Sequence, residues 1–160
     1  MSGHYEIERK YLVEYPEFPL PCEDRVSGIV QAYLVSEPGV SERVRARDGR
    51  YYHTRKRRIS GIRAEEGERE ISREEYDLLL NRRDPACRVI EKKRHVFEYR
   101  GQVFELDIFP FWKCQAMLEI ELADENAEVC LPPFISLIRE VTDDEAYKNH
   151  AMSMAIPPED

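Results

Sequence analysis

The 160-residue sequence lacks the features of a membrane, secreted or disulfide-bonded protein. No apolar run approaches the roughly 18 residues that cross a bilayer, and the N-terminus has no apolar signal-peptide segment. The four cysteines are far apart in the sequence and form neither a CxxC pair nor a zinc-type cluster with the four histidines. We therefore expect a cytoplasmic protein with reduced thiols and no membrane partner.

An excess of positive charge is also missing. The chain has 24 Lys and Arg against 32 Asp and Glu, a formal net charge of −8, whereas a general nucleic-acid binder is usually basic. Neither a Walker glycine loop nor a GxGxxG motif is present, so phosphate binding would depend on side chains. Charge itself is abundant, because 35% of the residues are charged against about 25% in an average protein. Some charged side chains are therefore expected to face inward.

The chain reads as one domain, residues 1–160, without repeats or low-complexity tracts. A Pro-rich loop at residues 15–22 follows the first predicted strand. The pairs Asp48-Gly49, Ser60-Gly61 and Arg100-Gly101 have the composition of hairpin turns, which indicates mostly antiparallel pairing. About eight strands are predicted, at residues 4–13, 29–35, 42–47, 51–57, 68–72, 88–99, 102–109 and 116–122.

Helical signals are few. Ser72 and Glu75 form a capping-box pattern ahead of helically spaced apolar residues, and Thr142 and Glu145 repeat it near the C-terminus. A third short helix is predicted at residues 124–130. The fold class is therefore mainly β (α+β), with helices between or after the strands.

The strands place charged residues at positions i and i+2, which point to the same face of a strand. These sets are Glu6, Glu8 and Lys10; Arg43, Arg45 and Arg47; Glu68 and Glu70; Lys92 and Arg94; Glu105 and Asp107; and Glu119 and Glu121. A sheet with one solvated face is the ordinary outcome of such alternation. Solvated faces usually mix the two signs, however, whereas several faces here carry only one.

The alternative is a closed barrel with a charged interior, in which apolar faces point outward under helices or against a partner subunit, so that a homodimer is one option. Carboxylates without His or Cys beside them favour Mg²⁺ or Mn²⁺ over zinc. Several Arg and Lys side chains on rigid strands suit a ligand with several phosphate groups. A small-molecule polyphosphate is therefore the expected partner.

The motifs resemble those of the CYTH superfamily, the triphosphate tunnel metalloenzymes, and in particular its small bacterial inorganic tripolyphosphatases. The first is the ExExK pattern of residues 6–10. In chain order, further matches are QAYL at 31–34, RVR at 43–45, TRK at 54–56, EREI at 68–71, EKKR at 91–94, FELD at 104–107, EIE at 119–121, EVT at 140–142 and YKN at 147–149. The resemblance covers nearly the whole chain.

The resemblance implies a closed eight-stranded antiparallel β-barrel tunnel, with a few helices packed outside and a C-terminal helix at the tunnel mouth. It implies one or two Mg²⁺ or Mn²⁺ ions bound by Glu6, Glu8, Asp107, Glu119 and Glu121, with Glu68 and Glu70 as supporting acidic residues. It implies substrate binding by Lys10, Arg43, Arg45, Lys56, Lys92, Arg94 and Lys148, with Lys148 closing one mouth. The implied catalytic residues are Tyr33, Lys56 and Lys92, the first two as a dyad.

One position departs from the family pattern. Glu66 stands two residues before the acidic pair, where the family leads us to expect an arginine. Whether this strand takes part in anion binding is therefore an open question. The chain also has basic residues beyond the minimum that the family requires. They are expected either as surface charges or as contacts for longer polyphosphates, and they are Arg47, Arg57, Arg58 and Lys93.

The resemblance implies a metal-dependent triphosphatase that hydrolyses inorganic tripolyphosphate to pyrophosphate and phosphate. A hydrolase of thiamine triphosphate or nucleoside triphosphates, or a class IV-type adenylate cyclase, is the alternative, and Phe111 and Trp112 could stack on the organic group. A non-catalytic polyphosphate-binding module and an RNA 5′-triphosphatase are further alternatives. The clustered carboxylates argue against the former, and the acidic net charge against the latter.

Overall fold

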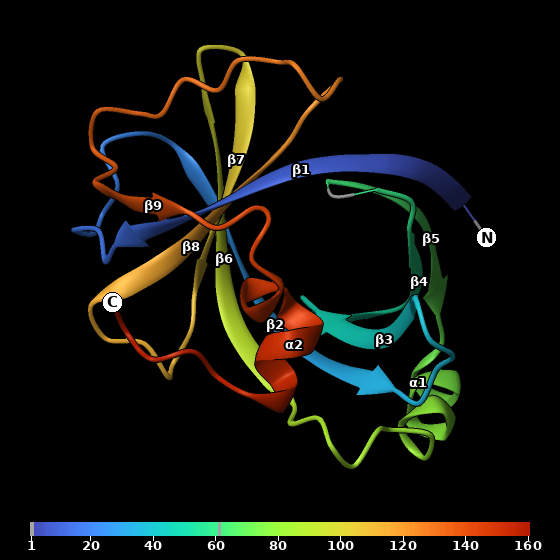
Figure 1. Cartoon of the computed structure of the whole chain (residues 1–160). Helices are drawn as coiled ribbons and strands as arrows, with labels where there is room; N and C mark the ends of the chain where they lie inside the picture. The colour runs from blue at the N-terminus through green and yellow to red at the C-terminus, as the bar shows by residue number, and fades with distance from the viewer. Residues whose placement is uncertain (1, 61) are drawn as a thin grey trace.

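The computed structural model describes residues 2–60 and 62–160, and Figure 1 shows its strands curving into a ring. The strands are β1 (Ser2–Glu14), β2 (Asp24–Leu34), β3 (Val40–Arg47), β4 (Arg50–Arg58), β5 (Arg63–Ile71), β6 (Ile90–Tyr99), β7 (Gln102–Ile108), β8 (Gln115–Glu121) and β9 (Leu137–Glu140). The helical elements are α1 (Arg73–Leu80), the 3₁₀ turn η1 (Glu145–Tyr147) and α2 (Asn149–Met154). The eight predicted strands correspond to β1 to β8, and β9 was not predicted.

Eight antiparallel strands close into a barrel in the order β5-β4-β3-β2-β6-β7-β8-β1. The long strand β1 makes the closure, because its first half, as far as Ile7, pairs with β5, and its second half, from Glu8, pairs with β8. The ninth strand, β9, pairs with β1 alone and lies outside the ring. The predicted closed eight-stranded barrel is therefore confirmed.

Two of the predicted hairpin turns have the backbone conformation that their sequences require. Asp48 and Gly49 both have positive φ, at 50° and 78°, and Arg100 and Gly101 follow with 48° and 76°. Two successive residues with positive φ make a type I′ turn, whose twist matches that of the flanking strands. The Ser60-Gly61 turn includes a position outside the described residues.

The first predicted helix is α1, in which the Ser72 hydroxyl accepts a hydrogen bond from the Glu75 amide at 3.0 Å. The capping role predicted for Thr142 is wrong, because its hydroxyl accepts a hydrogen bond from the Lys10 amide and Asp144 caps η1 instead. The helix predicted at residues 124–130 is also wrong. The Asp124 carboxylate accepts a hydrogen bond from the Asn126 amide, which forms a local turn rather than a helical start.

Two of the apolar clusters lie on the outside of the barrel wall, and a third fills part of its interior. Loops at residues 15–23 and 122–136 cover one cluster, which includes Leu20, Phe104, Leu106, Leu118 and Ile120. Helix α1 covers a second outer cluster. The cluster beside the C-terminal segment includes Leu12, Ile90, Phe109 and Met117, which share the inward strand faces and fill one part of the interior. Burial of these clusters stabilises the barrel, since each large apolar side chain contributes about 1.5–3 kcal/mol. The rest of the interior is lined by charged groups. Among the described residues, no helix is long and apolar enough to span a membrane.

Candidate active site

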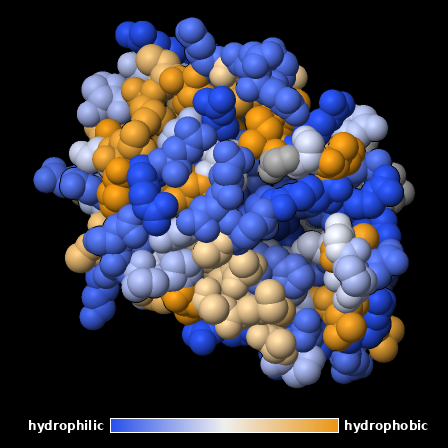
Figure 2. Space-filling view, in the orientation of Figure 1, coloured by the Kyte–Doolittle hydropathy of each residue, from blue (hydrophilic) through white to orange (hydrophobic). Residues whose placement is uncertain are grey.

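The barrel encloses a cavity of about 780 Å³ that opens beside α2. Charged side chains line it on nearly every strand, because the i and i+2 positions singled out in the sequence point inward. Figure 2 shows hydrophilic side chains around the hollow between β1 and α2. The charged strand faces therefore surround an enclosed space and do not form an outer surface.

Most of the predicted site residues meet in this cavity. The lining includes Glu6, Glu8, Lys10, Tyr33, Arg43, Arg45, Lys56, Glu68, Lys92, Arg94, Glu119, Glu121 and Lys148. Asp107 and Glu70, which the structure also describes, are not among the lining residues. The half-exposed side chain of Glu70 instead lies 3.6 Å from Arg50. Lys148 lines the mouth from the residue before α2 and not from within the helix, because the helix begins at Asn149.

Two lysines lie among the carboxylates of β1 and β8. Lys56 Nζ is hydrogen-bonded to Glu6 and lies 3.7 Å from Glu8, and Lys10 Nζ is 3.2 Å from Glu119. Burial and the neighbouring Glu66 raise the pKa of Glu6, and burial and Glu119 raise that of Glu8. Their raised pKa values show that the two lysines do not fully compensate these carboxylates.

Asp107 lies beneath the cavity in a buried ion cluster. Its carboxylate accepts two hydrogen bonds of 2.8 Å from Arg94 and lies 2.9 Å from Lys92 Nζ. Burial alone would raise the pKa of Asp107, but Arg94 and Lys92 hold it well below its usual range. Both of its oxygens are engaged, so metal binding by Asp107 would have to displace these cations.

Arg45, on β3, has much weaker compensation. Arg45 is buried and donates from Nε and Nη2 to the Gln31 carbonyl oxygen, at 3.2 and 3.0 Å. Burial and the nearby cations Arg43 and Arg94 shift the pKa of Arg45 below its usual range. Within the described part of the chain, Arg43 Nε is a buried donor without a hydrogen-bond partner. Buried donors without partners are costly, which fits a site built to receive an anion.

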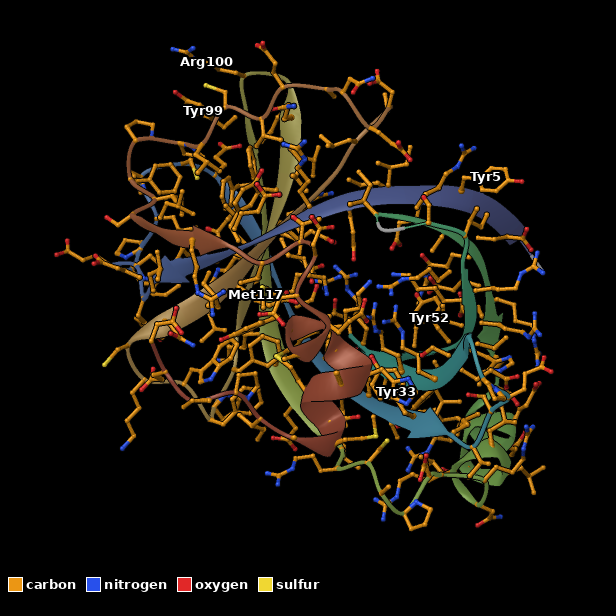
Figure 3. The ribbon with its side chains drawn as sticks, viewed as in Figure 1. Tyr5, Tyr33, Tyr52, Tyr99, Arg100 and Met117 are labelled. Atoms are coloured by element: carbon orange, nitrogen blue, oxygen red, sulfur yellow. The ribbon has the colours of Figure 1, made fainter. Side chains whose placement is uncertain are left out.

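The predicted Tyr33–Lys56 dyad is not a contact in this structure. Tyr33 stacks on His150 of α2, with ring centroids 4.5 Å apart, whereas Lys56 pairs with Glu6 and Glu8. In Figure 3, Tyr33 lies beside α2 and Tyr5 points away from the ring. Both dyad residues line the same cavity, so a role in catalysis remains a prediction for each.

Glu66, the departure from the family pattern, is buried and lines the cavity close to Glu6. The structure thus adds a carboxylate to the acidic side of the tunnel. Sequence analysis assigned no role to Gln31 and Asn149, although both lie in matched segments, and it missed His150; all three meet the site residues. Gln31 shares its strand face with Tyr33 and Asn149 follows Lys148, but neutral side chains in these positions give no distinct signal.

The carboxylates that line the cavity suit a divalent metal. Glu6, Glu8, Glu119 and Glu121 provide only oxygen donors, and the raised pKa values of Glu6 and Glu8 show that the protein alone does not balance their charge. Oxygen-only donor sets favour Mg²⁺ or Mn²⁺. Among the described residues, no three His, Cys, Asp or Glu side chains are already grouped as a metal site, so binding would require side-chain rotation.

Curated relatives resemble this chain over nearly its full length. The inorganic triphosphatase of Nitrosomonas europaea is 34% identical over 158 residues, which cover 95% of this chain and 99% of the relative. The chain belongs to the inorganic triphosphatase family, within the CYTH superfamily. The family's inorganic triphosphatase from Acetivibrio thermocellus is also 34% identical, over 90% of each chain. The match to this family agrees with the motif resemblance and with the charged tunnel.

Solved structures support the same family and fold. The structure of an inorganic triphosphatase superimposes with a TM-score of 0.64 at 31% identity, covering 96% of this chain and all of the other. A protein from Pyrococcus horikoshii gives a TM-score of 0.56 at 20% identity, over 76% of this chain and 80% of the other, and shows the shared fold alone. No family model matches the chain.

Proposed function

We propose that this protein hydrolyses inorganic tripolyphosphate to pyrophosphate and phosphate inside the tunnel. The observation that carries the proposal is the pairing, in one cavity of about 780 Å³, of incompletely compensated cations with incompletely compensated carboxylates. A polyphosphate would supply the missing negative charge on one side, and divalent metal the missing positive charge on the other. The relatives named inorganic triphosphatase support this substrate.

The cationic side chains would bind the substrate, and the carboxylates would bind the metal. Arg43, Arg45 and Lys92 would hold phosphate oxygens, which positions the terminal phosphorus and offsets its charge. Arg94, Lys10 and Lys56 would extend this grip, and Lys148 would contact the substrate at the mouth. In the reaction, water attacks the terminal phosphorus atom. The bond between this phosphorus and the bridging oxygen breaks, which releases pyrophosphate and phosphate.

Glu6, Glu8, Glu119 and Glu121 would hold one or two Mg²⁺ or Mn²⁺ ions, with Glu68 as a nearby acidic support. The bound metal supplies charge neutralisation of the phosphate oxygens and orientation or activation of water. We assign Asp107 to anchoring Lys92 and Arg94, because those two cations engage both of its oxygens.

The two rings expected to stack on an organic group lie outside the cavity. Trp112, a candidate for stacking on an organic group, is only 2% exposed and donates a hydrogen bond to the Pro157 carbonyl at 3.0 Å. Trp112 and Phe111 pack in the cluster under the C-terminal segment and do not line the cavity. Neither ring is therefore available to a base or thiazolium within the tunnel.

The test is a turnover assay that compares tripolyphosphate, ATP and thiamine triphosphate, each with Mg²⁺, with Mn²⁺ and with a chelator. We expect phosphate release from tripolyphosphate to exceed that from the organic substrates by at least tenfold and to vanish with the chelator. Preference for an organic triphosphate would refute the substrate assignment. Tight calorimetric binding of tripolyphosphate without product would instead indicate a binding module.

A further inference from the structure

Two neutral amides connect the cations of the tunnel, and no family motif role accounts for them. Gln31 is fully buried, and its carbonyl oxygen accepts both hydrogen bonds from Arg45. Its amide nitrogen donates to Asn149 Oδ1 at 3.3 Å, and the same oxygen accepts a hydrogen bond from Lys92 Nζ at 3.1 Å. The chain of contacts runs from β3 through β2 and the start of α2 to β6.

The choice of an amide in place of a carboxylate has an electrostatic consequence. An amide oxygen orients a cation by hydrogen bonding but leaves its full charge in place, whereas a carboxylate orients and neutralises it. Arg94 illustrates the second case, since Asp107 and Glu105 both accept hydrogen bonds from it. Arg45 illustrates the first case, because its hydrogen bonds go to the Gln31 amide.

We propose that Gln31 and Asn149 are positioning residues for a polyphosphate: Gln31 holds Arg45 while preserving its positive charge, and Asn149 holds Lys92, which also contacts Asp107, without adding a second carboxylate. This role rests on the proposed function. Asn149 is the first residue of α2, and the next residue, His150, stacks on Tyr33. The C-terminal helix therefore also contributes to the anion-binding site. The same hydrogen bonds thus hold α2 at the tunnel mouth and position the cationic side chains that would bind the substrate.

The decisive variant is Gln31→Glu, which keeps the shape and the acceptor oxygen, adds a negative charge beside Arg45 and replaces the amide donor to Asn149. Calorimetric titration of tripolyphosphate in the presence of a chelator measures anion affinity without turnover. We expect Kd to rise about 10- to 100-fold while the unfolding midpoint stays unchanged or increases, because the introduced carboxylate would pair with Arg45. A residue with a merely structural role would not lose affinity while stability is kept.

Asn149→Asp repeats the test at Lys92, and it keeps the proposal falsifiable if Gln31→Glu fails to fold. We expect Kd to rise about tenfold, and KM in the metal-activated assay to rise more than kcat falls. Gln102→Glu is the matched control. This residue lies in the β6–β7 hairpin region, where it bonds to the Glu128 carbonyl and the Cys130 amide, so the same charge change should leave Kd within twofold.

Unchanged affinity in both Gln31→Glu and Asn149→Asp, with a wild type that binds tripolyphosphate, would overturn this proposal and leave the proposed function intact. An equal loss in Gln102→Glu would also overturn it, since net charge alone would then explain the effect. A wild type that neither binds nor hydrolyses tripolyphosphate would refute the proposed function, and the positioning role with it.

Discussion

The carboxylates of the tunnel fall into two groups that differ in how the protein compensates them. Asp107 and Glu119 lie among Lys10, Lys92 and Arg94. Although burial acts to raise it, the pKa of Glu119 is held at about 2, mainly by Lys10. Glu6 and Glu8, on β1, instead have raised pKa values because burial and neighbouring carboxylates outweigh their lysine partners.

This difference separates charges that hold the tunnel together from charges that remain for ligands. A buried ion cluster with all its hydrogen bonds made costs little as a whole, but the loss of one member leaves the others unpaired. Carboxylates with raised pKa values are destabilised as anions, so a bound cation would stabilise them. The same isosteric change, acid to amide, should therefore act on stability at Asp107 and on metal binding at Glu6 and Glu8, whereas at Glu119, which also lines the cavity, it should act on both.

The largest expected effect is the loss of stability in Asp107→Asn. The change removes the negative charge between Lys92 and Arg94, both of which remain buried. Removal of one partner from a buried ion cluster costs about 3–5 kcal/mol, which chemical denaturation would measure as a lower free energy of unfolding. The matched control is Asp77→Asn, because Asp77 forms an exposed helical ion pair with Arg73. The free energy of unfolding should fall by less than about 0.5 kcal/mol in this control. Equal costs in the two variants would contradict the comparison.

Glu6→Gln should leave stability nearly unchanged but reduce phosphate release about 10²- to 10³-fold, as expected for the loss of a group that acts on transition-state charge. Neutralisation relieves the repulsion between Glu6 and Glu66, which offsets the weakened contact with Lys56. Calorimetric titration with Mn²⁺ should show weaker metal binding. Glu70→Gln, outside the cavity, should change turnover less than twofold. Full activity in Glu6→Gln would remove this residue from the metal site.

A smaller effect is expected in the pH dependence of stability. Burial lowers the pKa of Lys92 to about 7, although Asp107 acts in the opposite direction. Between pH 7 and pH 9 the unfolded chain keeps the Lys92 proton while the folded protein releases it. The free energy of unfolding should therefore rise with pH, by at most about 1.4 kcal/mol per unit for one proton. Denaturation of wild type and Lys92→Met across this range checks the slope, which should be shallower in the variant. Identical slopes would assign the proton to another group.

The sequence predicted the strands and hairpin turns well because strand alternation and turn composition are local signals, and the family resemblance implied their closure into a barrel. The hairpins at Asp48-Gly49 and Arg100-Gly101 need only their own residues to adopt positive φ. β9 was missed because it is four residues long and pairs only with the edge of β1. The predicted helix at residues 124–130 failed because those residues lie in a loop that packs Ala127 and Val129 on the outer core.

The charged faces were also predictable, since the i and i+2 spacing fixes which side chains share a face, whereas their inward direction was implied by the family resemblance. The partners of those side chains were not predictable. Which cation meets which acid depends on the register between strands distant in sequence, as in Lys10 opposite Glu119 and Arg94 opposite Asp107. The contacts of Gln31 and Asn149, 118 positions apart, have the same origin.

The sequence by itself determined the strands, their turns and the single-sign charged faces, because each of these depends on neighbouring residues. Only the tertiary structure decided which charges are balanced and which are left for ligands. The balance of a buried charge depends on the distance to opposite charges and on the water removed around it, and closure of the barrel sets both.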